Sequence, residues 1–295
     1  MSNKFKTLIS LTMTRYHIAR SLALTIVCAI TSPALAATTY STGFEDFTLG
    51  PMSTSAVGPT QGGWSGGAVG GFVNNDTGDE QIVDTEVHTG DQSWHYARGY
   101  NSPGSGTPYT PNLSDAVDNV GDSMSGAIWF KAHTAADNSL LAIETGNIAG
   151  TDRAEILAYI DNIGGGLTVR SFTNGPTFDG VPIASGLDAS VWHELSFSLT
   201  RTASENAVSI SIDGGTPVSF NGSLKGYRDS LLQPYSESSR LKFRARHTDG
   251  VAAFNGFYLD DISYSVSAAI PEPASFVLLG IAAGSFFVVR RRRRA

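Results

Sequence analysis

The chain has 295 residues, a formal net charge of −7 and one cysteine. The first 36 residues carry four basic residues and the C-terminal tail carries five, which leaves 11 basic and 27 acidic residues between 37 and 273, a net charge of −16. A domain with this negative charge repels phosphate backbones, which argues against nucleic-acid partners. Because Cys28, the only cysteine, precedes the domain, the domain has no disulfide framework, thiol nucleophile or cysteine metal site.

The N-terminal segment 1–36 is predicted to be a signal peptide. A basic start precedes the apolar stretch 22–30, and small residues at the −3 and −1 positions mark a cleavage site for signal peptidase. These residues are Ala34 and Ala36, so the mature chain is expected to begin at Ala37. The alternative, an N-terminal membrane anchor, is disfavoured because the apolar stretch is too short to span a bilayer.

The segment 37–266 has the pattern of an all-β domain. Short runs that alternate in polarity, or that are rich in β-branched and aromatic residues, are separated by clusters of Gly, Ser, Asn and Asp. The number and spacing of these runs predict a single antiparallel β-sandwich. The expected strands cover residues 81–87, 92–97, 125–132, 140–144, 154–160, 167–172, 193–200, 207–212, 240–246 and 256–266.

The two ends of this domain carry matching motifs. Gly-Phe-Glu at 43–45 opens it and Phe-Tyr-Leu-Asp-Asp-Ile at 257–262 closes it. These motifs resemble those of jelly-roll carbohydrate-binding modules, in which the first and last strands are neighbours. That resemblance brings Glu45 and Asp260 to one edge, where a structural Ca²⁺ would offset the repulsion between carboxylates. The alternative is that water or backbone amides satisfy the two acids.

A second motif lies in the middle of the domain. Trp192-His193 begins one expected strand, and Asp213-Gly214 follows the next. The pair resembles the centre of concanavalin A-like and laminin-G-like sandwiches. Together, the two resemblances imply that the all-β sandwich is a lectin-like jelly roll. His193 is therefore expected to pack rather than to act as a base.

The segment 99–111, rich in Gly and Pro, is the candidate for glycan contacts. Tyr100 and Tyr109 lie at its flanks, and aromatic rings stack on the apolar faces of sugars. In the alternative interpretation, Trp94 belongs to the core and the tyrosines pack the loop onto the sandwich.

Sequence signatures of an enzyme are weak. Glycosidases of this fold use E-x-D-x-x-E, and the acids Glu80, Asp84 and Glu86 do not match that spacing. There is no HExxH and no GxSxG. The sequence therefore predicts no catalytic residues and a protein that is not an enzyme.

The tail 267–295 consists of a short linker, a Pro-Glu-Pro triplet, the uncharged run 274–289 and an arginine cluster. As a helix the run would measure about 24 Å at ~1.5 Å per residue, close to the hydrocarbon thickness of a bilayer, and the arginines should stay cytoplasmic. This combination resembles the PEP-CTERM sorting signal, which implies processing by an exosortase-type membrane protease. The residues that carry the resemblance are Pro271, Glu272, Pro273, Ser275, Arg290, Arg291, Arg292, Arg293 and Arg294. The alternative is an ordinary single-span tail anchor.

Together these features predict an exported protein that is anchored transiently in the inner membrane and then released to the cell surface or the extracellular matrix. We expect a non-catalytic sandwich that binds polysaccharide. Two alternatives stay open, a structural or adhesion protein without glycan recognition and a polysaccharide-degrading enzyme.

Overall fold

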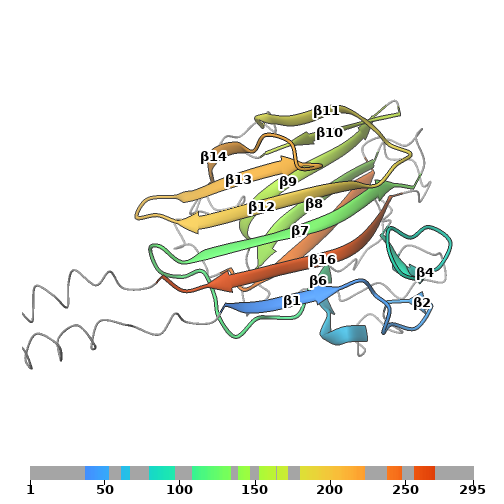
Figure 1. Cartoon of the computed structure of the whole chain (residues 1–295), viewed down its shortest axis with the longest axis horizontal. Coiled ribbons are helices and arrows are strands. Elements are labelled where there is room, and N and C mark those ends of the chain that lie inside the picture. Colours follow the sequence, from blue (N-terminus) through green and yellow to red (C-terminus); the bar gives the residue numbers. More distant parts are fainter. Residues whose placement is uncertain are drawn as a thin grey trace, which may run out of the picture. The chain divides into compact units, whose positions relative to one another are not determined.

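The computed structural model describes residues 37–52, 61–66, 80–96, 108–133, 139–146, 153–163, 165–171, 180–222, 238–247 and 256–269. Residues 36–269 form one compact unit. Two antiparallel sheets pack face to face in it (Figure 1). A 3₁₀ turn, Gln61–Gly63, is the only helical element among these residues.

The first sheet has nine strands in the order β14-β13-β12-β7-β16-β5-β4-β2, with β1 also paired to β16. Its strands are β1 (Thr38–Thr42), β2 (Gly50–Pro51), β4 (Glu80–Val83), β5 (Ser93–Tyr96), β7 (Ser123–Ala132), β12 (His193–Arg201), β13 (Asn206–Ile212), β14 (Val218–Gly222) and β16 (Phe257–Ser267).

The second sheet has seven strands in the order β11-β10-β9-β8-β15-β6-β3. Its strands are β3 (Ser65–Gly66), β6 (Pro108–Tyr109), β8 (Ser139–Gly146), β9 (Arg153–Ile163), β10 (Gly166–Arg170), β11 (Pro182–Asp188) and β15 (Arg240–His247).

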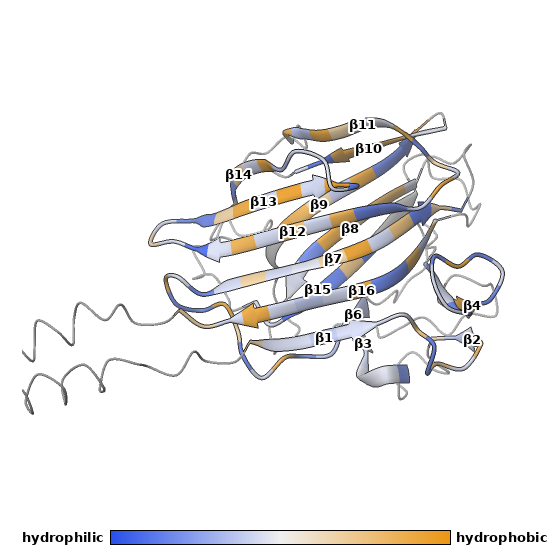
Figure 2. Cartoon of the chain, viewed as in Figure 1, coloured by the Kyte–Doolittle hydropathy of each residue, from blue (hydrophilic) through white to orange (hydrophobic). Residues whose placement is uncertain are grey.

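The core lies between the sheets, and the sequence alternation builds it. In β12, Leu195, Phe197 and Leu199 are buried, whereas Ser196 and Ser198 point to the opposite face. Figure 2 shows the same alternation of hydrophobic and polar bands along β12 and β13. Because side chains alternate across a strand, this pattern commits one face of each sheet to the core.

Strand β16 contains a bulge that decides where the ends of the domain meet. Before the bulge, the odd-numbered residues Phe257 and Leu259 face the core. After it, the even-numbered residues from Ile262 onward face the core, because the bulge inserts one extra residue into the strand. Asp261, in the bulge, has a φ of 43°. One edge of β16 pairs with β5 before the bulge and with β1 after it. The first and last strands are therefore neighbours, as expected.

The Trp-His and Asp-Gly motifs meet at the turn after β13. The His193 ring lies with Nδ1 at 2.7 Å from Asp213 Oδ2 and Nε2 at 2.9 Å from the Asp188 carbonyl oxygen. The Glu194 amide donates to Asp213 as well. Nδ1 of His193 thus fixes this turn and Nε2 contacts the end of β11, which agrees with a packing role.

The expected fold class, a single antiparallel jelly-roll sandwich, is confirmed. Each of the ten expected strands coincides with an observed strand, with ends displaced by a few residues. The six strands that the sequence did not reveal are short or polar: β1, β2, β3, β6, β11 and β14. The signal peptide and the tail from residue 270 onward lie outside the described residues. No helix in the described part of the chain has the length and hydrophobicity to cross a membrane.

Candidate functional site

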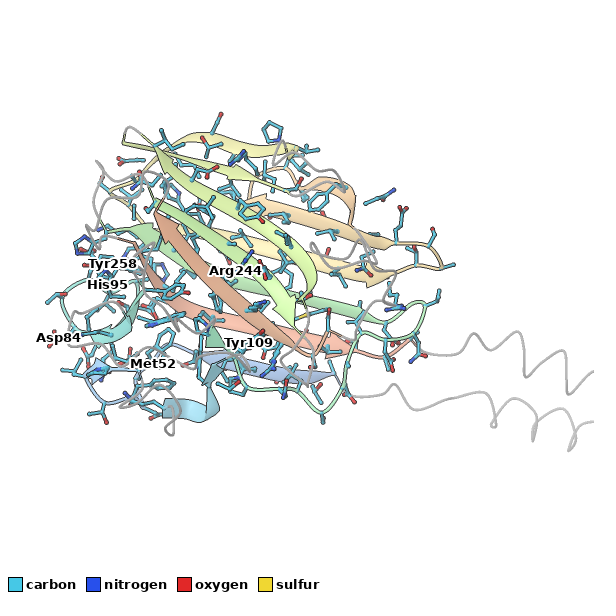
Figure 3. The ribbon with its side chains drawn as sticks, turned by 180° about the vertical axis from the view of Figure 1, so that it is seen from behind. Met52, Asp84, His95, Tyr109, Arg244 and Tyr258 are labelled. Carbon is cyan, nitrogen blue, oxygen red and sulfur yellow. The ribbon has the colours of Figure 1, made fainter. Side chains whose placement is uncertain are left out.

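Strand β15 carries three basic residues on the face of the seven-stranded sheet that points away from the core. Leu241 and Phe243 belong to the core, so the alternate residues Arg240, Lys242 and Arg244 lie on the opposite face. We call these three residues the basic strip. Figure 3 views the chain from this side and labels Arg244.

A buried carboxylate lies against the basic strip. Glu144 of β8, the cross-strand partner of Lys242, is fully buried. Its Oε1 lies 2.5 Å from Arg244 Nη2 and its Oε2 lies 3.3 Å from Lys242 Nζ. Burial lowers the pKa of Arg244, but the charge and hydrogen bond of Glu144, together with Tyr159 and Tyr96, outweigh that effect and hold the pKa above its usual value. Arg244 therefore stays charged although it is more than nine-tenths buried, whereas burial lowers the pKa of Arg240.

An aromatic ring lies beneath the strip. Tyr109 of β6 pairs with Lys242 and is 2% exposed. The Arg240 guanidinium lies 4.2 Å from the centre of its ring and the Lys242 ammonium lies 5.3 Å from it. Arg240 also donates to Ser65 Oγ over 2.9 Å. These cation–π contacts hold two of the three cations in place.

The neighbouring strands give the same face an apolar part and a further ion pair. Ala142, Ile156 and Tyr159 form a small buried cluster separate from the main core, and Ala142 is the direct partner of both Arg244 and Tyr159. Next to it, Arg170 Nη2 lies 2.5 Å from Asp161 Oδ2. Cations, two tyrosines and apolar groups thus share one face.

This arrangement suits an anionic, ring-shaped ligand. Guanidinium and ammonium groups bind carboxylate, sulfate or phosphate, and aromatic rings accept the apolar faces of sugars. Low exposure makes each charge interaction stronger than it would be in water. By chemistry alone, the face is a candidate site for an acidic glycan.

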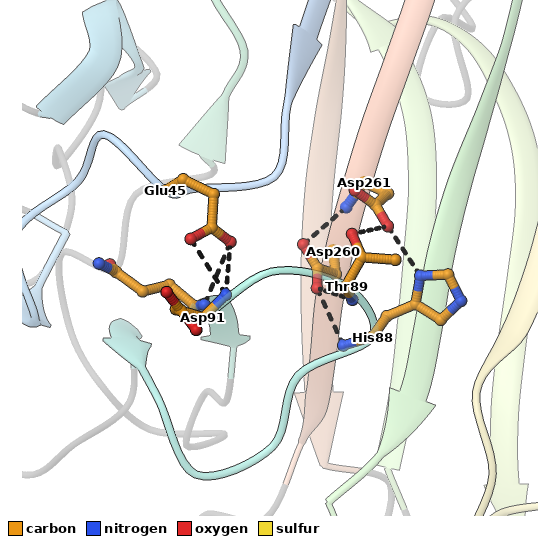
Figure 4. A network of polar contacts seen from close by, with 7 residues as sticks. Glu45, His88, Thr89, Asp91, Asp260 and Asp261 are labelled. Atoms are coloured by element: carbon orange, nitrogen blue, oxygen red, sulfur yellow. Dashed lines mark hydrogen bonds and ion pairs between the residues drawn. The ribbon is translucent and has the colours of Figure 1, made fainter.

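The acids Glu45 and Asp260 lie at the bulge of β16, on either side of the loop 86–92 (Figure 4). Glu45 accepts the backbone N–H groups of Asp91 and Gln92, at 3.0 to 3.2 Å. Gly90 has a φ of 69°, and a Cβ there would lie 2.1 Å from Glu45 Oε1. Only glycine therefore lets the carboxylate approach this loop.

Asp260 holds the other end of the same loop. Its Oδ2 accepts the N–H groups of His88 and Thr89, at 3.0 and 3.3 Å. Burial raises the pKa of Asp260 to about 6. Asp261 accepts hydrogen bonds from the side chains of His88 and Thr89, at 2.7 and 2.8 Å.

This geometry matches the alternative in which backbone amides satisfy the acids. Glu45 and Asp260 meet across a loop, as the end motifs implied, but each is engaged by N–H donors. Within the described ranges, no group of three or more His, Cys, Asp or Glu side chains is arranged to hold a metal ion. A structural Ca²⁺ at Glu45 and Asp260 stays a prediction.

The proposed glycan tyrosines lie differently from what the sequence suggested. Tyr109 lies on strand β6 and is buried, rather than exposed on a loop, because β6 pairs with β15. Tyr100 lies outside the described residues. Trp94 is fully buried on β5 within the aromatic core, as its alternative interpretation expected.

The basic strip was missed by sequence reasoning. The segment 240–246, Arg-Leu-Lys-Phe-Arg-Ala-Arg, predicts a strand by its alternation, but no binding role is expected for its basic residues in the sequence analysis. The signal was present, because a basic residue at every second position places all of them on one face. Glu144 lacked any visible partner, since its strand is distant from β15 in sequence.

Comparison with known proteins supports the tail assignment. Residues 269–294 match the PEP-CTERM protein-sorting motif. The expected sorting signal is thereby confirmed, and it implies export, a membrane-anchored sorting signal and exosortase processing. No curated protein matches the chain in sequence.

Solved structures share the sandwich. A variant of the alginate lyase Aly36B in complex with alginate trisaccharide is 10% identical, with a TM-score of 0.50 over 79% of this chain and 99% of that chain. A second Aly36B variant with alginate tetrasaccharide is 12% identical, with a TM-score of 0.46 over 79% and 98%. A carbohydrate esterase from the Shiga toxin-encoding bacteriophage phi24B is 17% identical, with a TM-score of 0.44 over 75% and 100%. At such identities the likeness shows the fold alone.

The expectation that the protein is not an enzyme, which was based on missing sequence motifs, is contradicted by the comparison with solved structures. The solved structures that resemble the chain include alginate lyases, a carbohydrate esterase and GH43 proteins, one of them a glycoside hydrolase. A sandwich of this fold is therefore compatible with catalysis.

Proposed function

We propose that the exported protein binds an acidic polysaccharide at the basic strip. The observation that carries this proposal is the alignment of Arg240, Lys242 and Arg244 on one face, above the ring of Tyr109. The domain has a net charge of −16, so cations gathered on one strand are contrary to its general composition. Among the residues that the structure describes, this strand offers a polymer with one carboxylate per sugar three cations side by side.

The test is a binding measurement with the purified exported protein. Alginate serves as the acidic probe and an uncharged glucan as the neutral one. We expect binding to alginate that weakens with added salt, since salt screens the attraction between the charged polymer and the protein as they approach. Arg240→Gln and Lys242→Gln should each weaken it about tenfold.

The matched control is Arg201→Gln, which removes a cation from β12 in the other sheet. It should bind like the unmodified protein. Equal affinity for the neutral glucan, or an equal effect of Arg201→Gln, would overturn the proposal.

Cleavage of the bound polysaccharide is a second candidate function, favoured by the position of Tyr159. Its strand neighbour Ala142 also pairs with Arg244, and the phenol contributes to the raised pKa of that guanidinium. A cation that neutralises a uronate carboxylate makes the adjacent C5 proton more acidic, and a tyrosine beside that cation can remove it. The C4–oxygen bond then breaks, the leaving oxygen takes a proton, and a C4–C5 double bond remains.

This reaction has a specific readout. Its product is a conjugated unsaturated uronate that absorbs ultraviolet light, whereas hydrolysis releases reducing ends without that absorbance. Tyr159→Phe should abolish the absorbance change and leave binding nearly unchanged. Binding without product formation would support a glycan-binding protein instead.

A further inference from the structure

A groove crosses the outward face of the nine-stranded sheet, the sheet that does not carry the basic strip. Its volume is about 710 Å³, and it continues from the sheet past the turn after β1. The floor consists of small residues in one cross-strand row, Ala127, Ser263 and Ser41. Trp129 follows Ala127 by two positions on β7, and Glu194 of β12 is its direct partner.

The indole of Trp129 is held in one orientation. The ring of His88 stacks on it, with centroids 3.7 Å apart and planes inclined by 17°. His88 in turn contacts Trp192 edge-on at 5.7 Å and lies 2.7 Å from Asp261, which also lines the groove. The loop that carries His88 is fixed by Asp260 from beneath. A half-buried aromatic side chain is thus immobilised at the wall of the groove before any ligand arrives.

The charges of the groove are all of one sign. Its described lining contains four carboxylates and no lysine or arginine: Glu45, Asp46, Glu194 and Asp261. The carboxylate of Glu194 has no hydrogen-bond or ion-pair partner in the part of the chain that the structure describes. The groove therefore complements a cation, the opposite of the ligand that suits the basic strip.

We propose that this groove binds a protonated amino sugar within a polysaccharide. The apolar face of the ring would lie against Trp129, and the hydroxyl groups of Ser41 and Ser263 on the floor would meet its hydroxyls. The ammonium group would face Glu194 and Asp261, where a charge-assisted hydrogen bond is strongest. A hydroxylated floor beside an aromatic wall suits a sugar ring better than a lysine side chain, which would use the charge alone.

The experiment compares two probes of equal length on the purified exported protein, an oligomer of glucosamine and an oligomer of N-acetylglucosamine. Calorimetry should show tighter binding of the glucosamine oligomer, and added salt should reduce the difference. Glu194→Gln, which keeps the shape and removes the charge, should weaken glucosamine binding about tenfold. Trp129→Leu should weaken both oligomers.

Two variants serve as controls. Glu205→Gln removes a charge from the turn between β12 and β13, outside the groove, and should have no effect. Arg240→Gln alters the basic strip and should also leave glucosamine binding unchanged. The proposal for the groove is therefore tested independently of the proposal for the basic strip. Equal affinity for the two oligomers, an unaltered affinity in Glu194→Gln, or equally tight binding of a lysine peptide of the same charge would each overturn the proposal.

Discussion

The carboxylate of Asp122 accepts a hydrogen bond from the backbone N–H of Ala269 over 2.7 Å. Ala269 is the first residue of the matched sorting motif, so the sandwich itself holds the chain where that motif begins. Gly121, with a φ of 93°, lets the two segments approach, because a Cβ there would lie 2.8 Å from that of Ala269. The motif thus begins at an anchored position rather than on a free linker.

The first prediction concerns this anchor. Asp122 is 3% exposed, and although burial acts to raise its pKa, the amides of Ala269, Asn119 and Asp118 outweigh it and lower the pKa. Asp122→Ala should cost about 1–3 kcal/mol, because it leaves buried N–H groups without their acceptor. Hydrogen exchange at Ala269 should accelerate.

Asp84→Ala, at an exposed acid directly after β4, is the control and should leave that exchange unchanged. Since the folded-state pKa of Asp122 is depressed, its contribution should be present at neutral pH and disappear as the pH falls through that pKa. An unaltered exchange rate in Asp122→Ala would contradict the anchor.

The second prediction concerns the buried ion pair of Glu144 and Arg244. Arg244→Met should destabilise the domain by about 3–5 kcal/mol, because a buried carboxylate loses a partner. The double variant with Glu144→Gln should cost less than the sum of the single variants, which denaturant unfolding can measure as a coupling energy. Additive losses would mean that the two side chains do not interact.

The third prediction is a pH dependence that Asp260 alone should cause. Burial raises its folded-state pKa from 3.8 to about 6, so its contribution to stability is fully present below pH 3.8 and is lost as the pH rises through about 6. Relative to Asp260→Asn, the unmodified protein should lose of order 2 kcal/mol across this window, measured with chelator present. Parallel stability curves for the two proteins would contradict the shifted pKa.

The fourth prediction tests Ca²⁺ at the end motifs. If Glu45 and Asp260 bind the ion, it should stabilise the fold by about 2.7 kcal/mol at 100 times the dissociation constant, and chelator should lower the melting temperature. Glu45→Gln and Asp260→Ala should remove that sensitivity to chelator, whatever their effect on stability itself. If chelator does not change the melting curve, Glu45 and Asp260 are satisfied by backbone amide hydrogen bonds and bind no Ca²⁺.

The fifth prediction concerns the mature ends. Thr38 and Val266 are cross-strand partners, so the expected cleavage site before Ala37 and the sorting motif from residue 269 both lie close in sequence to paired strand ends. Mass spectrometry of surface material should find Ala37 at the N-terminus and no Arg290 to Arg294. Surface protein that retains the arginines would point to a plain tail anchor.

Much of the fold could be predicted from the sequence because it depends on local patterns. Alternation with a period of two marks a strand wherever it is long enough, as in β7, β12 and β16. The short strands β1, β6 and β14 could not be predicted, because backbone pairing with a neighbour, rather than their own side chains, defines them. The sorting tail was recognisable for the same local reason, since its triplet, apolar run and arginines are contiguous.

What the tertiary structure decided is which distant residues share a face. Nothing local in Glu144 or Tyr109 indicates that β15 will lie between β8 and β6, yet that strand order assembles the basic strip with its carboxylate and its ring. The loop 86–92 likewise meets Glu45 and Asp260 only because a bulge in β16 lets β5 and β1 share one edge. The sequence determined the longer strands through their alternation, and it determined the sorting signal through a contiguous motif. The candidate sites arise from long-range pairing, which the order of strands in the sheets establishes.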